Sequence, residues 1–271
     1  MGVAKKKFEV AIIGGGIAGV TLAIALNARN VPVTIYEQAP QFGEVGAGVS
    51  FSPNAVQAMK ACHDGIYEAF EKVCTQNVWP SKKNVWFDYL NGYDQNADGH
   101  QQAAFTITNS LGQTGVHRAR FLDEMVKLIP KKIAKFGKRL EDITTKSDGR
   151  LELRFMDGSR AEADVVIGCD GIKSKVRQLI VGANDPAAYP TYTHKYAYRG
   201  LVPMDKAIEV IGEERAKNSC MHVGIMQSLS AGRRRLTGNI DGSRWPCADV
   251  RGQSWRDLEY CSIPHHKGRL A

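Results

Sequence analysis

Three glycines near the N-terminus have the spacing of a phosphate-binding turn. Gly14, Gly16 and Gly19 fit the pattern G-x-G-x-x-G between an apolar run, Val10–Ile13, and a helical pattern, Ile17–Asn27. The first glycine allows a tight turn, the second lets the backbone approach a pyrophosphate, and the third lets the helix pack against the strand. N–H groups at the helix start, with the positive end of its dipole, stabilise phosphate charge. The pattern therefore predicts a nucleotide-binding βαβ unit.

An acidic residue follows this pattern at the distance that a dinucleotide site needs. Glu37 ends the next apolar run, 18 residues after Gly19. A carboxylate at that place accepts hydrogen bonds from ribose hydroxyls. The alternative is a glycine-rich turn without a ligand, and the strand–helix context together with Glu37 favours the nucleotide site.

The elements that must position these residues follow an α/β order. Residues 139–167 are typical of a β-meander, with Asp-Gly turn signals at 148–149 and 157–158. The run Ala163–Gly168 predicts a central parallel strand, so that the chain returns to its first sheet. Periodicity predicts helices at about 55–62, 66–73, 116–129 and 204–217, and strand-like segments at 191–198 and 219–223.

Composition narrows the class of protein. The 271 residues are 43% hydrophobic and 24% charged, with a net charge of +8. No run of about 18 apolar residues predicts a membrane span, and the N-terminus lacks a signal-peptide pattern, so a cytoplasmic location is expected. The six cysteines show no metal-site spacing, so no metal is expected. Without a nucleic-acid-binding motif, the basic balance favours anionic cofactors and phenolate or carboxylate substrates.

Two further motifs make a resemblance specific. They are Val116-His-Arg-Ala-Arg-Phe121 and the segment Ile167–Arg177, which contains Asp170-Gly171. With the glycine pattern, the sequence over about 8–224 resembles FAD-dependent aromatic monooxygenases of the salicylate hydroxylase and p-hydroxybenzoate hydroxylase type. Within them it is most similar to fungal 3-methylorcinaldehyde monooxygenase-like enzymes, through His194–Leu201 and Met221–Gly224.

The resemblance implies a fold and a division of the chain. The fold is α/β, with a Rossmann-like FAD/NAD(P)-binding doubly wound sheet, an inserted β-meander and a partial β-rich substrate domain. The implied segments are 1–77 and 116–182 for the FAD-binding domain, 78–115 and 183–224 for the substrate domain, and 225–271 as an aberrant or unstructured tail.

The resemblance also assigns cofactor-binding residues. It implies that Gly14, Gly16 and Gly19 hold the FAD pyrophosphate and that Glu37 binds the adenosine ribose. The loop with Gly46, Ala47 and Gly48 passes near the flavin, Arg118 contacts the cofactor, and Asp170 with Gly171 supports pyrophosphate and NAD(P)H engagement. Alternatives stay open for Arg118 as a solvated or capping residue and for Asp170 as an ordinary turn residue.

The implied chemistry is hydroxylation of a phenolic or aromatic-acid molecule by oxygen, through a flavin C4a-hydroperoxide formed after NAD(P)H reduces FAD. Flavin and oxygen supply the difficult chemistry, and the electrophilic oxygen needs an electron-rich ring such as a phenolate. The resemblance places Arg199 where relatives anchor the substrate. Its guanidinium would lower the substrate pKa and fix the anion; the alternative is an arginine on a strand surface.

The family resemblance and the regular periodicity of the sequence both end after Gly224. Relatives of this type are usually about 400 residues or longer. The expected cause is a frameshift, a retained intron or a mispredicted exon.

The main prediction is an FAD-dependent monooxygenase of fungal secondary metabolism or aromatic catabolism. One alternative is a non-catalytic nucleotide-binding remnant. The other alternative is an NAD-dependent dehydrogenase. A catalytic Tyr-x-x-x-Lys pair of that class is missing here, because none of the tyrosines after the second motif has a Lys four residues later: Tyr189, Tyr192, Tyr196 and Tyr198.

Overall fold

The computed structural model describes residues 8–43, 48–91, 103–192, 198–200, 202–223, 247–250 and 258–262. The chain divides into two compact units. The first unit comprises residues 1–46, 54–73 and 118–192, and the second comprises 47–53, 74–117 and 193–271.

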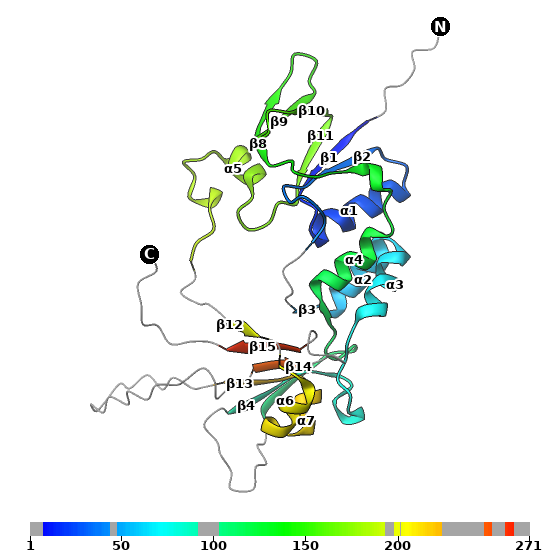
Figure 1. The fold of residues 1–271 in the computed structure, drawn as a ribbon, viewed down its shortest axis with the longest axis vertical. Helices are drawn as coiled ribbons and strands as arrows, with labels where there is room; N and C mark the ends of the chain where they lie inside the picture. Colours follow the sequence, from blue (N-terminus) through cyan, green and yellow to red (C-terminus); the bar gives the residue numbers. More distant parts are fainter. Residues whose placement is uncertain are drawn as a thin grey trace, which may run out of the picture. The chain divides into compact units, whose positions relative to one another are not determined.

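A parallel sheet forms the centre of the first unit (Figure 1). Its strand order is β11-β1-β2-β7, and β1 (Val10–Ile13) pairs in parallel with both β2 (Val33–Tyr36) and β11 (Val165–Gly168). The predicted return of the chain to its first sheet is therefore confirmed. The prediction of a central strand is wrong, because β11 lies at one end of this strand order and is partly exposed. The apolar pattern of a strand does not show which strands lie beside it in the sheet, because that depends on how the chain crosses from one strand to the next.

Side chains of β1 alternate between the two faces of this sheet, as a pleated strand requires. Ala11 and Ile13 join a core cluster with Leu153, Phe155 and Val176, from the meander and the helix that follows it. Ile12, fully buried, lies on the other face beside the first helix, at Gly19. The sheet thus lies between helix and meander.

The predicted meander is confirmed as a three-stranded antiparallel sheet of β8 (Leu140–Thr145), β9 (Leu151–Phe155) and β10 (Arg160–Ala163). Gly149 and Gly158, in the two predicted turns, have φ of +82° and +80°. Phe155 of β9 stacks on Tyr36 of β2 at 4.8 Å between ring centroids. This contact joins the meander to the parallel sheet.

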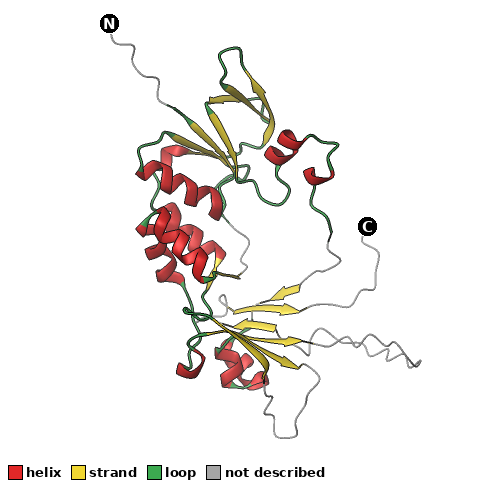
Figure 2. Ribbon diagram, turned by 180° about the vertical axis from the view of Figure 1, so that it is seen from behind, coloured by secondary structure: helices red, strands yellow, loops and turns green. Residues whose placement is uncertain are grey.

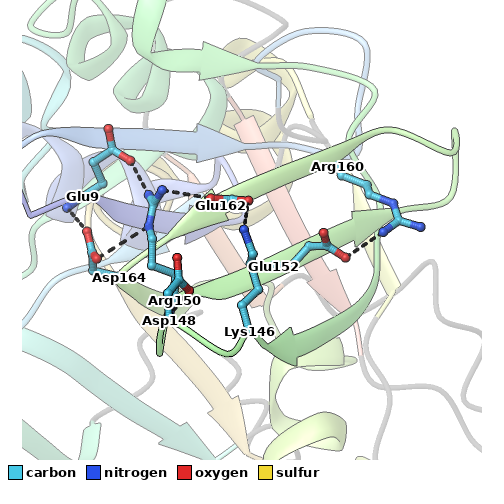
Figure 3. A network of polar contacts seen from close by, with 8 residues as sticks. All are labelled: Glu9, Lys146, Asp148, Arg150, Glu152, Arg160, Glu162 and Asp164. Carbon is cyan, nitrogen blue, oxygen red and sulfur yellow. Dashed lines mark hydrogen bonds and ion pairs between the residues drawn. The ribbon is translucent and has the colours of Figure 1, made fainter.

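Arg150, in the turn between β8 and β9, ties the meander to the start of β1 (Figure 3). Its Nη2 lies 2.7 Å from Glu9, its Nη1 lies 2.9 Å from Glu162, and its Nε lies 3.6 Å from Asp164. The backbone N–H of Glu9 also donates to Asp164 at 2.8 Å. Arg150 is only 15% exposed, but Glu9 is 53% and Glu162 37% exposed, so solvent still screens the carboxylates of this cluster.

In the first unit α4 packs against α1, and α3 packs against α4 (Figure 2). Phe70 and Phe121 join two of them through an edge-to-face contact at 6.1 Å. The remaining elements of this unit are α1 (Ile17–Ala28), α2 (Pro53–Cys62), α3 (Asp64–Val73), α4 (Arg118–Val126), β7 (Ala134–Lys135), α5 (Lys175–Val181) and short 3-10 helices at Lys131–Ile133 and Pro186–Ala188.

The second unit contains small sheets of order β13-β4-β5, β12-β15-β14 and β3-β6. The predicted helix over 204–217 is broken into two at Gly212, which has a φ of +81° that few other residues adopt. The elements are β3 (Gly48–Ser50), a 3-10 helix (Pro80–Lys82), β4 (Val85–Asn91), β5 (Ala103–Thr108), β6 (Gly115–His117), β12 (Tyr198–Gly200), α6 (Met204–Ile211), α7 (Glu213–Lys217), β13 (Cys220–Val223), β14 (Cys247–Val250) and β15 (Leu258–Ser262).

Two of these strands, β14 and β15, lie in the segment 225–271, for which the sequence predicted no regular structure. They pair with each other, and β15 also pairs with β12. These strands are defined by pairing between segments far apart in the chain, as of β12 with β15, and local periodicity does not report such pairing. Among the described helices, none combines the length and the apolar character that crossing a bilayer requires.

Candidate functional site

The glycine turn has the tight backbone geometry that its sequence predicts. Gly14 has a φ of +107°, and its N–H donates to the carbonyl of Tyr36 at 2.9 Å. A Cβ on Gly14 would lie 2.4 Å from the carbonyl oxygen of Cys169, and one on Gly19 would lie 2.0 Å from that of Gly14. Both distances are far below van der Waals contact, so only glycine fits at these two positions.

The first turn of α1 presents backbone N–H groups without a side-chain cap. Gly16 is the residue that precedes the helix, with extended φ and ψ of −74° and −175°. Its carbonyl accepts the first helical hydrogen bond, from Val20 at 3.0 Å, and no acidic residue lies in the first turn. The N–H groups of such a turn have no intrahelical partner and can bind an anion.

Glu37 directly follows β2, and its carboxylate is tied to two loops. One oxygen, Oε2, accepts from the backbone N–H of Gly15 at 2.6 Å, and Oε1 accepts from that of Ala39 at 2.7 Å. Each carboxylate oxygen has two lone pairs, so both oxygens can still accept from a hydroxyl. The sequence predicted an acceptor here, and it did not predict the contact with the glycine turn.

Asp170 caps α5 from outside the helix. Its Oδ2 accepts from the backbone N–H groups of Lys175 at 2.6 Å and Val176 at 3.1 Å, and its Oδ1 accepts from the Ser174 hydroxyl at 2.6 Å. Its own N–H lies 3.0 Å from the Cβ position of Gly14. A capping role for Asp170 is therefore part of the structure, beside the glycine turn.

Cys169, the residue before Asp170, fixes the distance between the glycine turn and the Asp170-Gly171 motif. Its N–H donates to the carbonyl of Ile13 at 2.7 Å, which extends the pairing of β11 with β1. Burial, and to a lesser degree the carboxylate of Asp170, raises the pKa of the Cys169 thiol above its ordinary value. The thiol is therefore neutral at pH 7, and it adds no negative charge beside a phosphate site.

The other predicted site residues fall elsewhere. Gly48 lies on β3 and Arg118 begins α4, while Ala47 lies outside the described residues. Arg199 lies on β12, opposite Cys261 of β15. The structure thus brings together Gly14, Gly19, Glu37 and Asp170 in the first unit, and it places Gly48 and Arg199 in the second.

Sequence reasoning missed two side chains before α4 that have buried polar atoms. Gln113 is fully buried; its Nε2 donates to the Ser50 hydroxyl at 2.8 Å, and its Oε1 has no hydrogen-bond partner among the described residues. The Nδ1 atom of His117 is likewise buried and has no partner there. The only signal in the sequence was their place beside Arg118, since burial depends on the whole fold.

A cavity of about 250 Å³ lies in the second unit between β4 and the two helices α6 and α7. Lys82, Asp88 and Ser219 are among its lining residues. Lys82 donates to Asp88 at 2.7 Å within it. None of the residues predicted for the cofactor or substrate lines this cavity.

The motifs agree with those of known proteins. The family model described as "FAD binding domain" matches residues 7–184. The FAD-dependent monooxygenase pigN of Monascus ruber is 49% identical over 228 residues, 82% of this chain and 51% of that protein. The 6-methylsalicylate 1-monooxygenase atA of Aspergillus terreus is 47% identical over 222 residues, 80% of this chain and 49% of that protein.

A solved structure gives the same result for the fold. A salicylate hydroxylase in complex with its substrate matches with a TM-score of 0.63 and 33% identity, over 81% of this chain and 51% of that one. The chain spans about half the length of the curated relatives that it matches. The predicted resemblance, fold class and FAD cofactor are confirmed by these matches. This chain belongs to the FAD binding domain family.

Proposed function

We propose that this chain provides the FAD site and part of the substrate domain of an FAD- and NAD(P)H-dependent monooxygenase that hydroxylates a phenolic or aromatic-acid molecule. The observation that carries the proposal is the contact of Gly14 with Cys169 and Asp170. It joins two motifs, separated by some 150 residues, into one continuous backbone surface at the start of α1. A surface of this kind suits a dinucleotide rather than a single phosphate.

The residues fit FAD on three grounds. The glycine turn packs the backbone of Gly14 against Cys169 and Asp170, which brings the two motifs together at the start of α1. The uncapped start of α1 suits a pyrophosphate, and the carboxylate of Glu37 suits the adenosine ribose. Arg118 would contact the cofactor as well.

Bound FAD would supply the redox and oxygen chemistry, which amino-acid side chains lack. In our proposal Arg199 does the remaining work on the substrate. A guanidinium beside a phenol lowers the phenol pKa and holds the anion in one orientation through two N–H groups. Arg199 moves no proton itself, because a guanidinium stays protonated in proteins.

The names of the relatives support a substrate class. One relative is a 6-methylsalicylate 1-monooxygenase, another is a salicylate hydroxylase of Sarocladium schorii, and the matched structure is a salicylate hydroxylase. We therefore propose an aromatic acid with a neighbouring phenol, within fungal secondary metabolism or aromatic catabolism. We also propose a cytoplasmic location, since Cys62 and Cys169 are free thiols.

The test is to express the 271-residue chain, add FAD, desalt it and record the visible spectrum. A bound oxidised-flavin spectrum, followed by NADH or NADPH oxidation that salicylate or 6-methylsalicylate stimulates, is the expected result. Bound flavin without any stimulated oxidation would support the non-catalytic nucleotide-binding alternative. A colourless protein that is folded by circular dichroism would contradict the proposed FAD site.

A further inference from the structure

The strand β5 lies at the end of a sheet in the second unit and carries no charge. The strand order is β13-β4-β5, and among the described strands β5 pairs only with β4. All residues of Ala103–Thr108 are exposed, with Phe105 at 54% and Ile107 at 42%. The segment 101–116 contains no charged residue, although 24% of the chain is charged. Edge strands usually carry a Lys or a Pro that prevents further pairing, and β5 has neither.

The backbone of Thr106 faces the open edge of this sheet. Thr106 lies opposite Asp88 of β4. The N–H of Asp88 donates to the carbonyl of Ser219, the residue before β13, at 3.3 Å, so Asp88 turns its backbone away from β5. Opposite residues of an antiparallel pair either exchange two hydrogen bonds or exchange none. The N–H and carbonyl of Thr106 therefore point outward, where a further strand would pair.

Two side-chain contacts hold this edge in one conformation. The ring of Phe105 stacks on that of Tyr89 with 4.3 Å between the centroids and 14° between the planes. The hydroxyl of Thr106 donates to Oδ1 of Asp88 at 2.6 Å. A strand that is already ordered loses little conformational entropy when it binds a partner.

We propose that two copies of this chain associate through β5, with the strands antiparallel around a two-fold axis at Thr106. Each Thr106 then exchanges two backbone hydrogen bonds with its counterpart. Phe105 of one copy lies opposite Ile107 of the other, on one face of a continuous sheet. Pairs of an aromatic with a β-branched residue, and pairs of threonines, stabilise neighbouring strands.

The charge of β5 is what favours a second copy as the partner. A two-fold axis brings each charged residue near its own like-charged counterpart, and a strand without charges avoids that repulsion. The whole chain has a net charge of +8, so two copies repel each other at longer range. Because salt screens that repulsion, this dimer should become tighter as salt is added. An interface made of ion pairs would become weaker.

The experiment is sedimentation velocity of the 271-residue chain from low to high micromolar concentration, at low and high salt. Wild type should shift from monomer to dimer and no further, because a two-fold contact closes. Ile107→Lys and Ile107→Glu should each raise the dimer dissociation constant about tenfold or more. Val210→Lys, at an exposed residue of α6 in the same unit, is the control and should not change it.

An equimolar mixture of Ile107→Lys and Ile107→Glu separates pairing from misfolding. Across the proposed axis the two side chains are diagonal neighbours, within reach of each other. The mixture should therefore recover a dimer that neither variant forms alone. Thr106→Cys gives a second measurement, since opposite residues of a bonded pair are about 5.5 Å apart at Cα, which a disulfide can span. Oxidation should link its two copies, and wild type with its own cysteines is the reference.

Several outcomes would overturn the inference. They are a wild type that stays monomeric at every concentration, a series of larger oligomers, and a dimer that Ile107→Lys leaves unchanged. A mixture of folded variants that recovers no dimer, together with Thr106→Cys that does not cross-link, would also overturn it. The proposed function is independent of these results, because the flavin spectrum tests it on monomer and dimer alike.

Discussion

The carboxylate of Glu37 accepts a 2.6 Å hydrogen bond from the backbone N–H of Gly15, between the first two glycines of the phosphate-binding turn. The end of β2 thus supports the turn that follows β1. The residue expected to bind the ribose also shapes the loop expected to bind the pyrophosphate. Substitution of Glu37 should consequently change both ligand affinity and folding.

Glu37→Gln should raise the FAD and ADP Kd values about tenfold and lower the free energy of unfolding by about 1–2 kcal/mol. The amide NH₂ cannot accept a hydrogen bond, so one backbone N–H, of Gly15 or Ala39, loses its partner. Ligand titration and urea unfolding measure the two effects. Glu141→Gln, at an exposed ion pair with Arg154, is the matched control and should change neither. A variant with wild-type values would contradict both roles of Glu37.

Gly14→Ala should abolish FAD binding and destabilise the protein by about 1–3 kcal/mol more than Gly137→Ala. Both glycines have positive φ, +107° and +67°, so both substitutions strain the backbone. Only at Gly14 would the new Cβ also collide with a carbonyl, that of Cys169, whereas nothing lies within 4 Å at Gly137. Thermal and urea unfolding of the two variants give the difference. Equal losses would mean that the turn relaxes around the methyl group.

Asp157→Asn should remove a pH-dependent part of the stability. Hydrogen bonds from Lys138 and Ser159 hold the pKa of Asp157 well below its usual range. A carboxyl with a lowered folded pKa stabilises the native state above its unfolded pKa of about 4, and this contribution disappears as pH falls. Urea unfolding should show wild type more stable than the variant at pH 6, with the difference shrinking toward pH 2. A difference that grows on acidification would reverse the assignment.

Arg199→Ala should reduce hydroxylation of a phenolic acid about a hundredfold in the enzyme that turns it over, a loss of about 2–3 kcal/mol. The flavin spectrum and the FAD Kd should not change, because Arg199 is assigned to the substrate. The pH of maximal rate should move upward, since the phenol would ionise without the help of a guanidinium. Arg199→Lys should keep part of that pH effect and lose the two-pronged anchor. Wild-type turnover in Arg199→Ala would refute the assigned role.

Local features of this fold were predictable from the sequence. The β1–α1–β2 unit follows from contacts between near neighbours, such as Gly14 with Gly19, and the meander turns follow from Asp-Gly pairs. Family resemblance added the FAD cofactor. The first two features use information that lies within a few tens of residues, whereas the resemblance combines motifs between Gly14 and Arg177.

Features that depend on distant contacts were not predictable. The order of strands, which depends on contacts between distant segments, places β11 at the end of the sheet. The break at Gly212 has a local cause, a glycine with positive φ, which the apolar periodicity of 204–217 does not show. The buried nitrogen of His117 depends on which segments lie together, whereas the capping bonds of Asp170 are local and reach only as far as Val176. The predicted roles of all the site residues stay predictions: those of Gly14, Gly16, Gly19, Glu37, Ala47, Gly48, Arg118, Asp170 and Arg199.

The pairing of β1 with β11 has a consequence for synthesis of the chain on the ribosome. β1 can pair with β2 as soon as both emerge, but its other neighbour starts at Val165, more than a hundred residues later. At about 5–20 residues per second, the apolar edge of β1 waits on the order of ten seconds for that partner. Throughout this interval the nascent chain exposes Val10–Ile13 to other strands. A chaperone that shields this segment should therefore raise the yield of folded protein more than one that acts after release.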